Sequence, residues 1–265
     1  MKRAPAIILL LLMVAGATAL TLCGNDYAAQ DRNATMAPAT AGHWTGTDEL
    51  GRDRTARVAA ALLIGLTGAA IAAAITTALA ACFGLFAAFC PSWLAALLMF
   101  VSDAFLSLPW LFLLMMARSV LPLTASPMQT AVTTFLVLAA LGWPACARAI
   151  YRGAVALRSA EWMTQGRACG LKNGQMIHLH LVPHLRPLFL PQFLISVPAF
   201  IMAEANLGAL GLGVGEPMPS WGAMLMELDN SAVLARSPWV YLPIVLLGVV
   251  LLILESFTNE VETHA

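Results

Sequence analysis

Residues 203 to 226 read AEANLGALGLGVGEPMPSWGAMLM, and this is the most informative stretch of the chain. It joins a hydrophobic run to a loop that is broken by glycine and proline and ends in Pro219-Ser220-Trp221-Gly222. The apolar part is typical of a membrane-spanning helix, and the Gly/Pro-rich part predicts where that helix ends. The junction therefore indicates a span followed by a loop at a membrane surface.

The composition of the whole chain indicates an integral membrane protein. Hydrophobic residues make up 60% and charged residues 11% of the 265 residues, and the mean hydropathy is +0.81. Ordinary globular domains contain about 45–50% apolar and about 25% charged residues. The formal net charge is zero and lysine is nearly absent, so the composition favours neither a nucleic acid nor an acidic partner.

Apolar segments of about 20 residues recur along the chain and predict an all-α polytopic membrane protein with about six transmembrane helices. We expect residues 1–265 to form a single transmembrane domain with an outer segment at 24–57 and a loop at 149–187. The predicted spans are 5–23, 58–89, 93–117, 128–148, 188–212 and 238–257.

The first apolar run also has features of a signal peptide, because Lys2-Arg3 precede it and small residues follow. The run from Pro5 to Leu22 is long enough to cross a bilayer, which favours its retention as a first membrane helix.

Lysine and arginine near the span ends predict the orientation in the membrane. The 149–187 loop is clearly cationic, whereas the arginines of the 24–57 segment alternate with acidic residues. We therefore expect the 149–187 loop and both termini in the cytoplasm.

The 149–187 loop contains a second pattern. Residues 158–181 have helical spacing that is broken at Gly170 and Gly174 and stopped at Pro183, which predicts two short helices across the membrane face. One interpretation is an amphipathic connector at the interface. The other is a docking surface for a cytoplasmic partner, because a short helix held on two spans can transmit a push.

Cysteine and histidine do not favour a metal site or disulfides. The cysteines have no paired spacing, and we expect them to be small buried residues. His178 and His180 point to different faces of a helix, and Pro183 separates His180 from His184, so we expect loop packing or capping, and no metal. The five cysteines are Cys23, Cys82, Cys90, Cys146 and Cys169.

A polar residue within a membrane span costs free energy of insertion, so such residues need an explanation. Two interpretations are open for each residue below. Asp103 in the third span either pairs with a bundle neighbour or lines a path. Glu204 with Asn206 either makes a structural hydrogen bond or lines or gates a path. Trp221 is either an interfacial anchor or a docking contact.

Three arginines at the start of the second span, Arg52, Arg54 and Arg57, favour a basic interfacial helix with local pairs to Asp48, Glu49 and Asp53. The alternative is contact with a substrate or a binding protein.

Several motifs together resemble the inner-membrane permease subunits of ATP-binding-cassette (ABC) importers for dipeptides, oligopeptides and nickel. Their cytoplasmic loop begins Glu-Ala-Ala, with a glycine six positions after the Glu and a proline thirteen positions later. Gly170 and Pro183 keep this spacing, and His180-Leu181-Val182-Pro183 is similar to its ending. The opening triplet departs from the pattern, because Thr164-Gln165-Gly166 stand there.

Further motifs extend the resemblance over residues 28–257. They are Gly46-Thr47-Asp48-Glu49-Leu50-Gly51-Arg52-Asp53 before the second span, Asp103 with Pro109, Gly142-Trp143-Pro144 with Arg148 and Arg152, and the 203–226 stretch. Four motifs in the right order make the resemblance specific.

The resemblance implies a type I ABC importer permease fold in a bacterial inner membrane. It implies that this chain forms half of a translocation path, with a second permease subunit, two cytoplasmic ATPase subunits and a periplasmic or extracellular substrate-binding protein. The chain has no G-x-x-x-x-G-K-[ST] loop, so we expect no cofactor and no enzyme activity in it, with ATP and Mg on the partner subunits. An ion-coupled secondary transporter is the alternative, but no repeat between the halves supports it.

Candidate roles follow from the resemblance together with the positions of the residues in the predicted spans and loops. Coupling to the ATPases falls on Glu161, Gln165, Gly166, Arg167, Gly170, His180 and Pro183; the path or gate on Asp103, Glu204 and Asn206; and docking of the binding protein on Pro219, Ser220 and Trp221.

Overall fold

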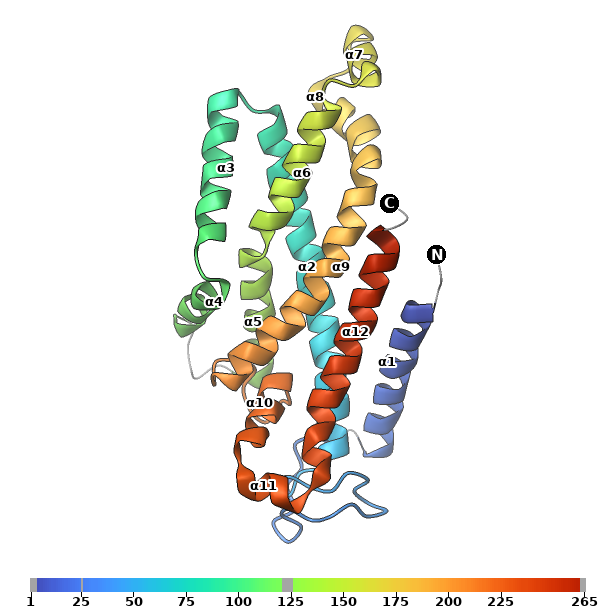
Figure 1. Ribbon diagram of the computed structural model, residues 1–265, viewed down its shortest axis with the longest axis vertical. Helices are drawn as coiled ribbons and strands as arrows, with labels where there is room; N and C mark the ends of the chain where they lie inside the picture. Colours follow the sequence, from blue (N-terminus) through green and yellow to red (C-terminus); the bar gives the residue numbers. More distant parts are fainter. Residues whose placement is uncertain (1–3, 25, 121–125, 263–265) are drawn as a thin grey trace.

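The computed structural model describes residues 4–24, 26–120 and 126–262, and these ranges form an elongated helical bundle (Figure 1). In this described part, the only β-type pairing is a single bridge between Thr47 and Asp53. The long helices are α1 (Ala4–Leu22), α2 (Arg54–Phe89), α3 (Ser92–Ser107), α4 (Trp110–Ser119), α5 (Pro127–Leu141), α6 (Trp143–Leu157), α9 (Val182–Ala209) and α12 (Leu242–Glu262).

Shorter helices lie at the two ends of the bundle. They are α7 (Glu161–Ala168), α8 (Asn173–Met176), a π-helical turn (Ile177–Leu181), α10 (Trp221–Met226), α11 (Ser231–Arg236) and 3-10 turns at Glu227–Asp229 and Pro238–Tyr241.

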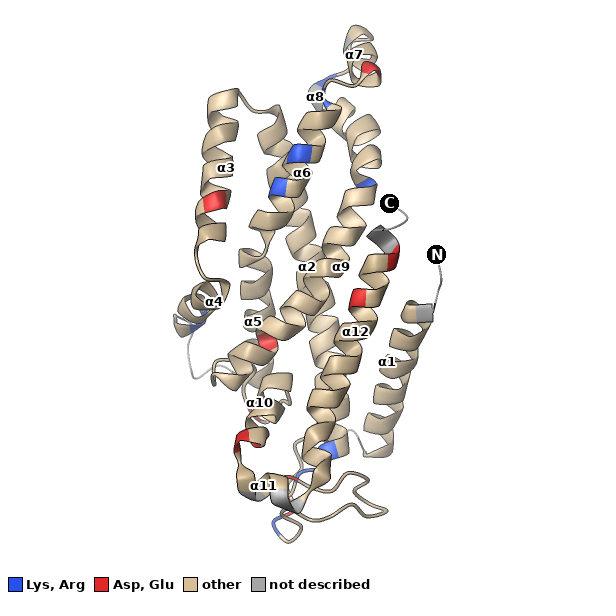
Figure 2. Ribbon diagram, viewed as in Figure 1, with Lys and Arg blue, Asp and Glu red and all other residues tan. Residues whose placement is uncertain are grey.

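Within the described ranges, five helical runs are long and apolar enough to cross a membrane, and the pair α3 and α4 makes a sixth if it counts as one span. Charged residues are absent from the lengths of α1 and α5 (Figure 2). The prediction of an all-α polytopic membrane protein is confirmed. The five runs are Pro5–Leu22, Arg54–Phe89, Pro127–Leu157, Gly174–Ala209 and Pro238–Glu260.

The third predicted span, 93–117, is not one continuous helix. Helix α3 ends at Ser107, α4 begins at Trp110, and the two meet at 90°. Leu108 is extended (φ −87°, ψ 142°), because a residue before proline avoids the helical region. Pro109 therefore breaks the segment into two helices of different direction.

The predicted interruptions at Gly174 and Pro183 are also wrong. Helical structure runs without a break from Gly174 to Ala209, so the predicted 188–212 span begins earlier and ends earlier. Pro183 lies in the first turn of α9, directly after the π-helical turn. A widened turn accommodates the proline, and neighbouring helices allow the other prolines inside α9.

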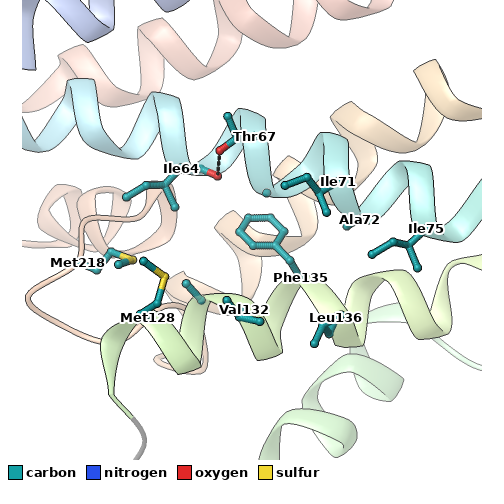
Figure 3. Close-up of a pocket in the computed structure, with 12 residues that line it drawn as sticks. Ile64, Thr67, Ile71, Ala72, Ile75, Met128, Val132, Phe135, Leu136 and Met218 are labelled. Atoms are coloured by element: carbon teal, nitrogen blue, oxygen red, sulfur yellow. Dashed lines mark hydrogen bonds between the residues drawn. The ribbon is translucent and has the colours of Figure 1, made fainter.

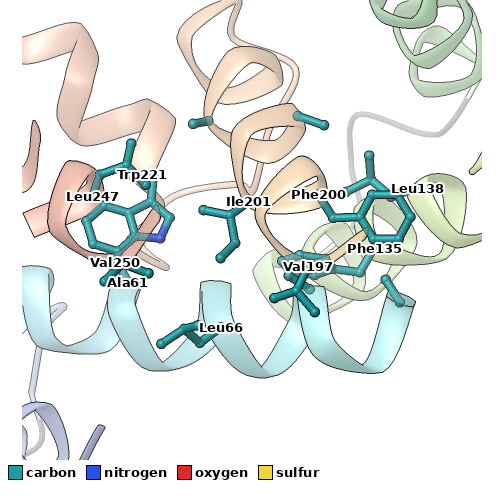
Figure 4. Close-up of a cluster of buried hydrophobic side chains, with 14 of the residues drawn as sticks. Ala61, Leu66, Phe135, Leu138, Val197, Phe200, Ile201, Trp221, Leu247 and Val250 are labelled. Atoms are coloured by element: carbon teal, nitrogen blue, oxygen red, sulfur yellow. The ribbon is translucent and has the colours of Figure 1, made fainter. Parts of the chain in front are cut away.

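Helix α2 is the centre of the bundle and contacts α1, α5, α6 and α9. Its buried face consists largely of alanine, which allows neighbouring backbones to approach closely where lipid supplies no hydrophobic drive. Larger side chains from the other helices fill the remaining space. Trp221 and Leu247 lie over Ala61 at one end of this core, and Phe200 and Leu138 gather near Phe135 at the other (Figure 4).

The cysteines differ from expectation, because only Cys146 is buried. Cys82 and Cys169 are exposed, Cys23 and Cys90 are half-buried, and all five are free thiols. Cys82 lies in α2 and Cys169 follows α7, and both side chains lie on the surface of the protein.

Helix α10 packs against the end of α9 through two glycines. The Cα of Gly222 faces Gly208, and a Cβ added to Gly208 would lie 2.7 Å from Gly222 Cα. A Cβ added to Gly222 would meet backbone atoms of Ala205, Gly208 and Ala209. The two helices can approach this closely only because neither residue has a side chain.

We expect Gly222→Ala to destabilise the protein by about 1–3 kcal/mol, the usual cost of overpacking. The matched control is Gly248→Ala in α12, where an added Cβ has no neighbour within 4 Å. Thermal unfolding in detergent should show a lower Tm for Gly222→Ala and no loss for Gly248→Ala. Equal Tm values for the two variants would contradict the close α9–α10 contact.

Candidate functional site

The segment 26–53 folds over one end of the bundle without forming a helix (Figure 1). It is closed by backbone hydrogen bonds, including Asp31 N–H to Gly51 O (3.2 Å) and Met36 N–H to Asp48 O (3.0 Å). Gly51 has φ +74°, a conformation that favours glycine, and its Cα lies against the backbone of Asp31. These turns bring Asp48 and Arg52 together beside the start of α2.

Two arginines at this end hold one glutamate from the loop after α9. Arg52 Nη1 lies 2.6 Å from Glu216 Oε2, and Arg57 Nη2 lies 3.0 Å from Glu216 Oε1. Arg52 Nε also donates to Asp48 Oδ2 at 2.6 Å. The guanidinium groups thus bridge the 26–53 segment, the start of α2 and the 210–220 loop.

The third arginine makes a separate tie. Arg54 Nη1 lies 2.6 Å from Glu227 Oε2, in the 3-10 turn that follows α10. Burial raises the pKa of the Glu227 carboxyl, against the opposing attraction of Arg54. This pair fixes the far end of α10 to the start of α2.

These contacts correct the prediction of a basic interfacial helix with local pairs to Asp48, Glu49 and Asp53. Arg52, Arg54 and Arg57 are buried, with 7%, 3% and 2% of their surface exposed. The local pair with Asp48 exists, but Arg54 and Arg57 find their closest partners in distant Glu227 and Glu216. A buried guanidinium requires a partner, and a local sequence pattern cannot supply one from so far along the chain.

Sequence reasoning missed Glu216 and Glu227. They are the first two acidic residues after Glu204, in a stretch that is otherwise apolar and rich in glycine. Together with three nearby arginines that need counter-ions, this isolation is the signal that would have identified them.

The predicted docking residues are not on the surface of this chain. Pro219 and Ser220 are buried, and Trp221 is completely buried in the core beside Gly65. Ser220 instead caps α10, since its hydroxyl accepts a hydrogen bond from Ala223 N–H (3.2 Å). The proline-containing loop before α10 positions the Trp221 indole in the interior. In this structure these residues therefore do not form a surface on which a binding protein could dock directly.

Glu204 and Asn206 lie on different faces of α9. Glu204 is 2% exposed and close to the Ser220 hydroxyl and the Trp221 backbone amide, whereas Asn206 is exposed. Neither Glu204 oxygen has a hydrogen-bond partner of ordinary geometry among the described residues. Glu204 thus lies at the α9–α10 contact.

Asp103 of α3 forms an ion pair with Arg148 of α6. Both side chains are partly exposed, at 41% and 36%. The pair is accompanied by a hydrogen bond from Ser102 Oγ to Pro144 O (3.1 Å), so polar contacts join the two helices.

The opposite end of the bundle carries α7, which projects beyond the long helices (Figure 1). Glu161 and Gln165 are exposed, whereas Gly166 packs on the Met176 sulfur. Gly170 ends the helix region with φ +80°. The side chain of Arg167 lies outside the described part.

The ring of Trp162 stacks on His184 of α9, with centroids 4.4 Å apart. His184 Nδ1 lies 2.6 Å from His180 O, and Pro183 and His180 are half-buried. These histidines therefore take part in packing that joins α7 to α9.

Two hollows lie near the α10 end. An apolar groove of about 300 Å³ runs between α2 and α5, where Phe135, Ile71 and Met128 line it (Figure 3). A polar cavity of about 650 Å³ lies among the end of α9, the glycine-rich loop, α10 and α4.

The arrangement defines a class: a polytopic helical membrane subunit with a folded polar cap at one end and a projecting helix at the other. Residues 80–259 match the family described as the binding-protein-dependent transport system inner membrane component. The chain belongs to this family.

Curated relatives are similar over most of the chain. A putative peptide permease protein of Brucella suis is 32% identical over 200 residues, which are 76% of this chain and 64% of that protein, so the match spans a little less than two thirds of its length. The oligopeptide transport system permease protein OppC of Mycobacterium tuberculosis is 30% identical over 254 residues, 95% of this chain and 84% of the relative. The dipeptide transport system permease protein DppC of Alkalihalophilus pseudofirmus is 28% identical over 221 residues, 83% and 70% of the two chains.

We expect Arg52→Ala to cost about 3–5 kcal/mol, because it leaves the buried Asp48 carboxylate without its closest counter-ion. Arg32→Ala is the matched control, since Arg32 is exposed in the same segment and a surface change of this kind stays within about 0.5 kcal/mol. Thermal unfolding and limited proteolysis of the 26–53 segment would measure the difference. The ion-pair network would be refuted as a structural tie by equal stability and equal proteolysis of both variants.

Proposed function

We propose that this chain is one of the membrane subunits that form the translocation path of an ATP-driven importer for peptides. Its membership of the binding-protein-dependent transport family supports the permease role. The three relatives named above are peptide, oligopeptide and dipeptide permeases, which favours peptides over nickel as the substrate. No observation favours ion-coupled secondary transport.

The α7–α8 end faces the cytoplasm in this proposal, and the 26–53 segment faces the outer side. The N-terminal end of α1 and the C-terminal end of α12 both point toward the α7 end (Figure 1), which supports the proposal that both termini share the cytoplasmic side with α7. The excess of Lys and Arg in the 149–187 loop supports the same orientation.

The proposed partners are a second permease subunit, two cytoplasmic ATPase subunits that carry ATP and Mg, and an outer substrate-binding protein. Helix α7 offers the ATPase contact, because it projects from the bundle and exposes Glu161 and Gln165. Gly166 keeps this helix close to Met176, and Gly170 supplies the turn that follows it.

Helix α9 transmits movement in this mechanism. Trp162 stacks on His184, so a displacement of α7 acts directly on α9. The helical run of 36 residues spans roughly 54 Å at 1.5 Å per residue, more than the hydrocarbon core of about 30 Å. Its far end leads into the loop held by Arg52 and Arg57, which thereby becomes the outer gate.

Asp103 and Glu204 have different parts in the proposed path. The Asp103–Arg148 pair is partly exposed within membrane-spanning segments, where charged groups face water or another protein chain, so it belongs to the path or to the second permease subunit. Glu204 sits at the α9–α10 contact and becomes accessible only when that contact opens. Asn206 is exposed and lies two residues after Glu204, on the other face of the same helix.

The proposed function is tested by purifying the tagged chain from its own membrane. We expect a second permease and two ATPases to copurify, and the reconstituted complex with its binding protein to take up dialanine only when ATP is present. ATP-independent uptake by this chain alone would overturn the proposal.

Gly170→Val should abolish most ATP-driven uptake, because a β-branched residue at φ +80° is strained by about 1–3 kcal/mol and reorients α7. Gly174→Ala is the control, since Gly174 lies in α8 with open space around it and no positive φ. Uptake and ATPase activity of the reconstituted complexes give the readout. Wild-type uptake by Gly170→Val would remove this turn from the coupling mechanism.

A further inference from the structure

The polar cavity at the outer end has features of a ligand site. It measures about 650 Å³, within the range of roughly 300–1,000 Å³ that ligand pockets occupy. Its walls come from separate parts of the chain: Glu49 of the outer segment, Arg118 of α4, Thr130 of α5, and the glycine-rich loop after α9.

Four charged side chains line this cavity, and two of them are already neutralised. Glu216 is bound by Arg52 and Arg57, and Glu227 is bound by Arg54. Glu49 and Arg118 remain, and neither has an ion-pair partner among the described residues. Among the described residues, the cavity therefore presents one carboxylate and one guanidinium without an ion-pair partner.

Arg118 is positioned to offer its charge to a ligand. Its Nε donates to Leu212 O at 3.0 Å, which fixes the guanidinium plane, and the residue is only 8% exposed. The two terminal nitrogens make no hydrogen bond within the described residues, and they are not enclosed by protein. A planar, pre-oriented guanidinium of this kind binds a carboxylate with two parallel hydrogen bonds.

Glu49 supplies the opposite charge. It is exposed, and its Oε1 accepts a hydrogen bond from Asn230 Nδ2 at 2.8 Å, which orients the carboxylate while leaving its other oxygen available. An ammonium group is the natural ligand for such an acceptor.

Small residues make up much of the remaining lining of the cavity. Four glycines, Ser220 and Ala223 line it, with Val214 and Met226 as the larger apolar side chains. A site with fixed charges and few large side chains recognises the ends of a ligand and tolerates variation in its middle.

We propose that this cavity binds both ends of a short zwitterionic peptide, with Glu49 on the ammonium and Arg118 on the carboxylate. This assignment rests on the proposed peptide-import function and adds a recognition site in the permease itself.

The test measures equilibrium binding of labelled dialanine to the complete importer in lipid nanodiscs, without the binding protein. Dialanine amide and N-acetyl-dialanine serve as competitors that each lack one charge. We expect either block to weaken wild-type binding about tenfold, which corresponds to about 1.4 kcal/mol. Glu49→Gln should weaken dialanine similarly but leave N-acetyl-dialanine unchanged, and Arg118→Gln should weaken dialanine but leave the amide unchanged.

Two further variants separate charge from structure. Arg118→Lys loses the Leu212 hydrogen bond but keeps the charge, so it should retain most of the preference for a free carboxylate. Asp229→Asn changes an exposed acid at the same end that does not line the cavity, and should bind all three peptides as the wild type does. Copurification with the partner subunits checks that each variant is folded.

The outcomes distinguish this assignment from the proposed function. If the wild-type importer transports dialanine with ATP but binds all three peptides equally, or if Glu49→Gln weakens all three equally, the site is wrong and the function stands. If the wild-type complex neither assembles with ATPases nor takes up dialanine, the proposed function fails and the site fails with it.

Discussion

One carboxylate, that of Glu216, is held by two buried arginines, and the end of the molecule that carries the 26–53 segment depends on this contact. Buried charges are tolerated only as complete networks, because an uncompensated charge in a low-dielectric interior costs several kcal/mol. Arg52 therefore needs both Asp48 and Glu216, which forces the 26–53 segment and the 210–220 loop together. With Arg54 holding Glu227, both ends of α10 are fixed, and Trp221 is seated in the core.

The same constraint gives α9 its importance. Its Ala209 end runs into the loop that carries Glu216, and its Val182 end is packed on α7 by the stacked rings of Trp162 and His184. The helix is unbroken between these points, so in the proposed mechanism it carries movement from one end to the other. The prolines within α9 and the π-helical turn before it allow the helix to curve, and each interrupts the backbone hydrogen bonds only locally.

The sequence predicted the class of fold well, because hydropathy measures what a bilayer requires of each segment. It could not reveal the 90° turn at Pro109, since length and composition do not give direction. It placed a stop at Pro183, where a preceding π-helical turn accommodates the ring. The acidic partners of the arginines could not be predicted from the sequence either, because Glu216 lies 164 residues from Arg52. Trp221 was misplaced for a related reason: its environment is created by glycines and alanines on other helices.

In the proposed assignment, the charges around the cavity divide into structural and recognition groups. Glu216 and Glu227 are paired with buried arginines, so they line the cavity without giving it a net charge. Glu49 and Arg118 hold their positions through neutral partners, an amide and a backbone carbonyl, which orient the side chains, and neither charge has an ion-pair partner in the described ranges. A charge that is oriented yet unpaired is costly to maintain unless water or a ligand reaches it. Because Arg118 is bound to Leu212 in the loop at the end of α9, movement of that helix would reposition the guanidinium, and the proposed binding at this cavity would be coupled to the state of the distant α7 end.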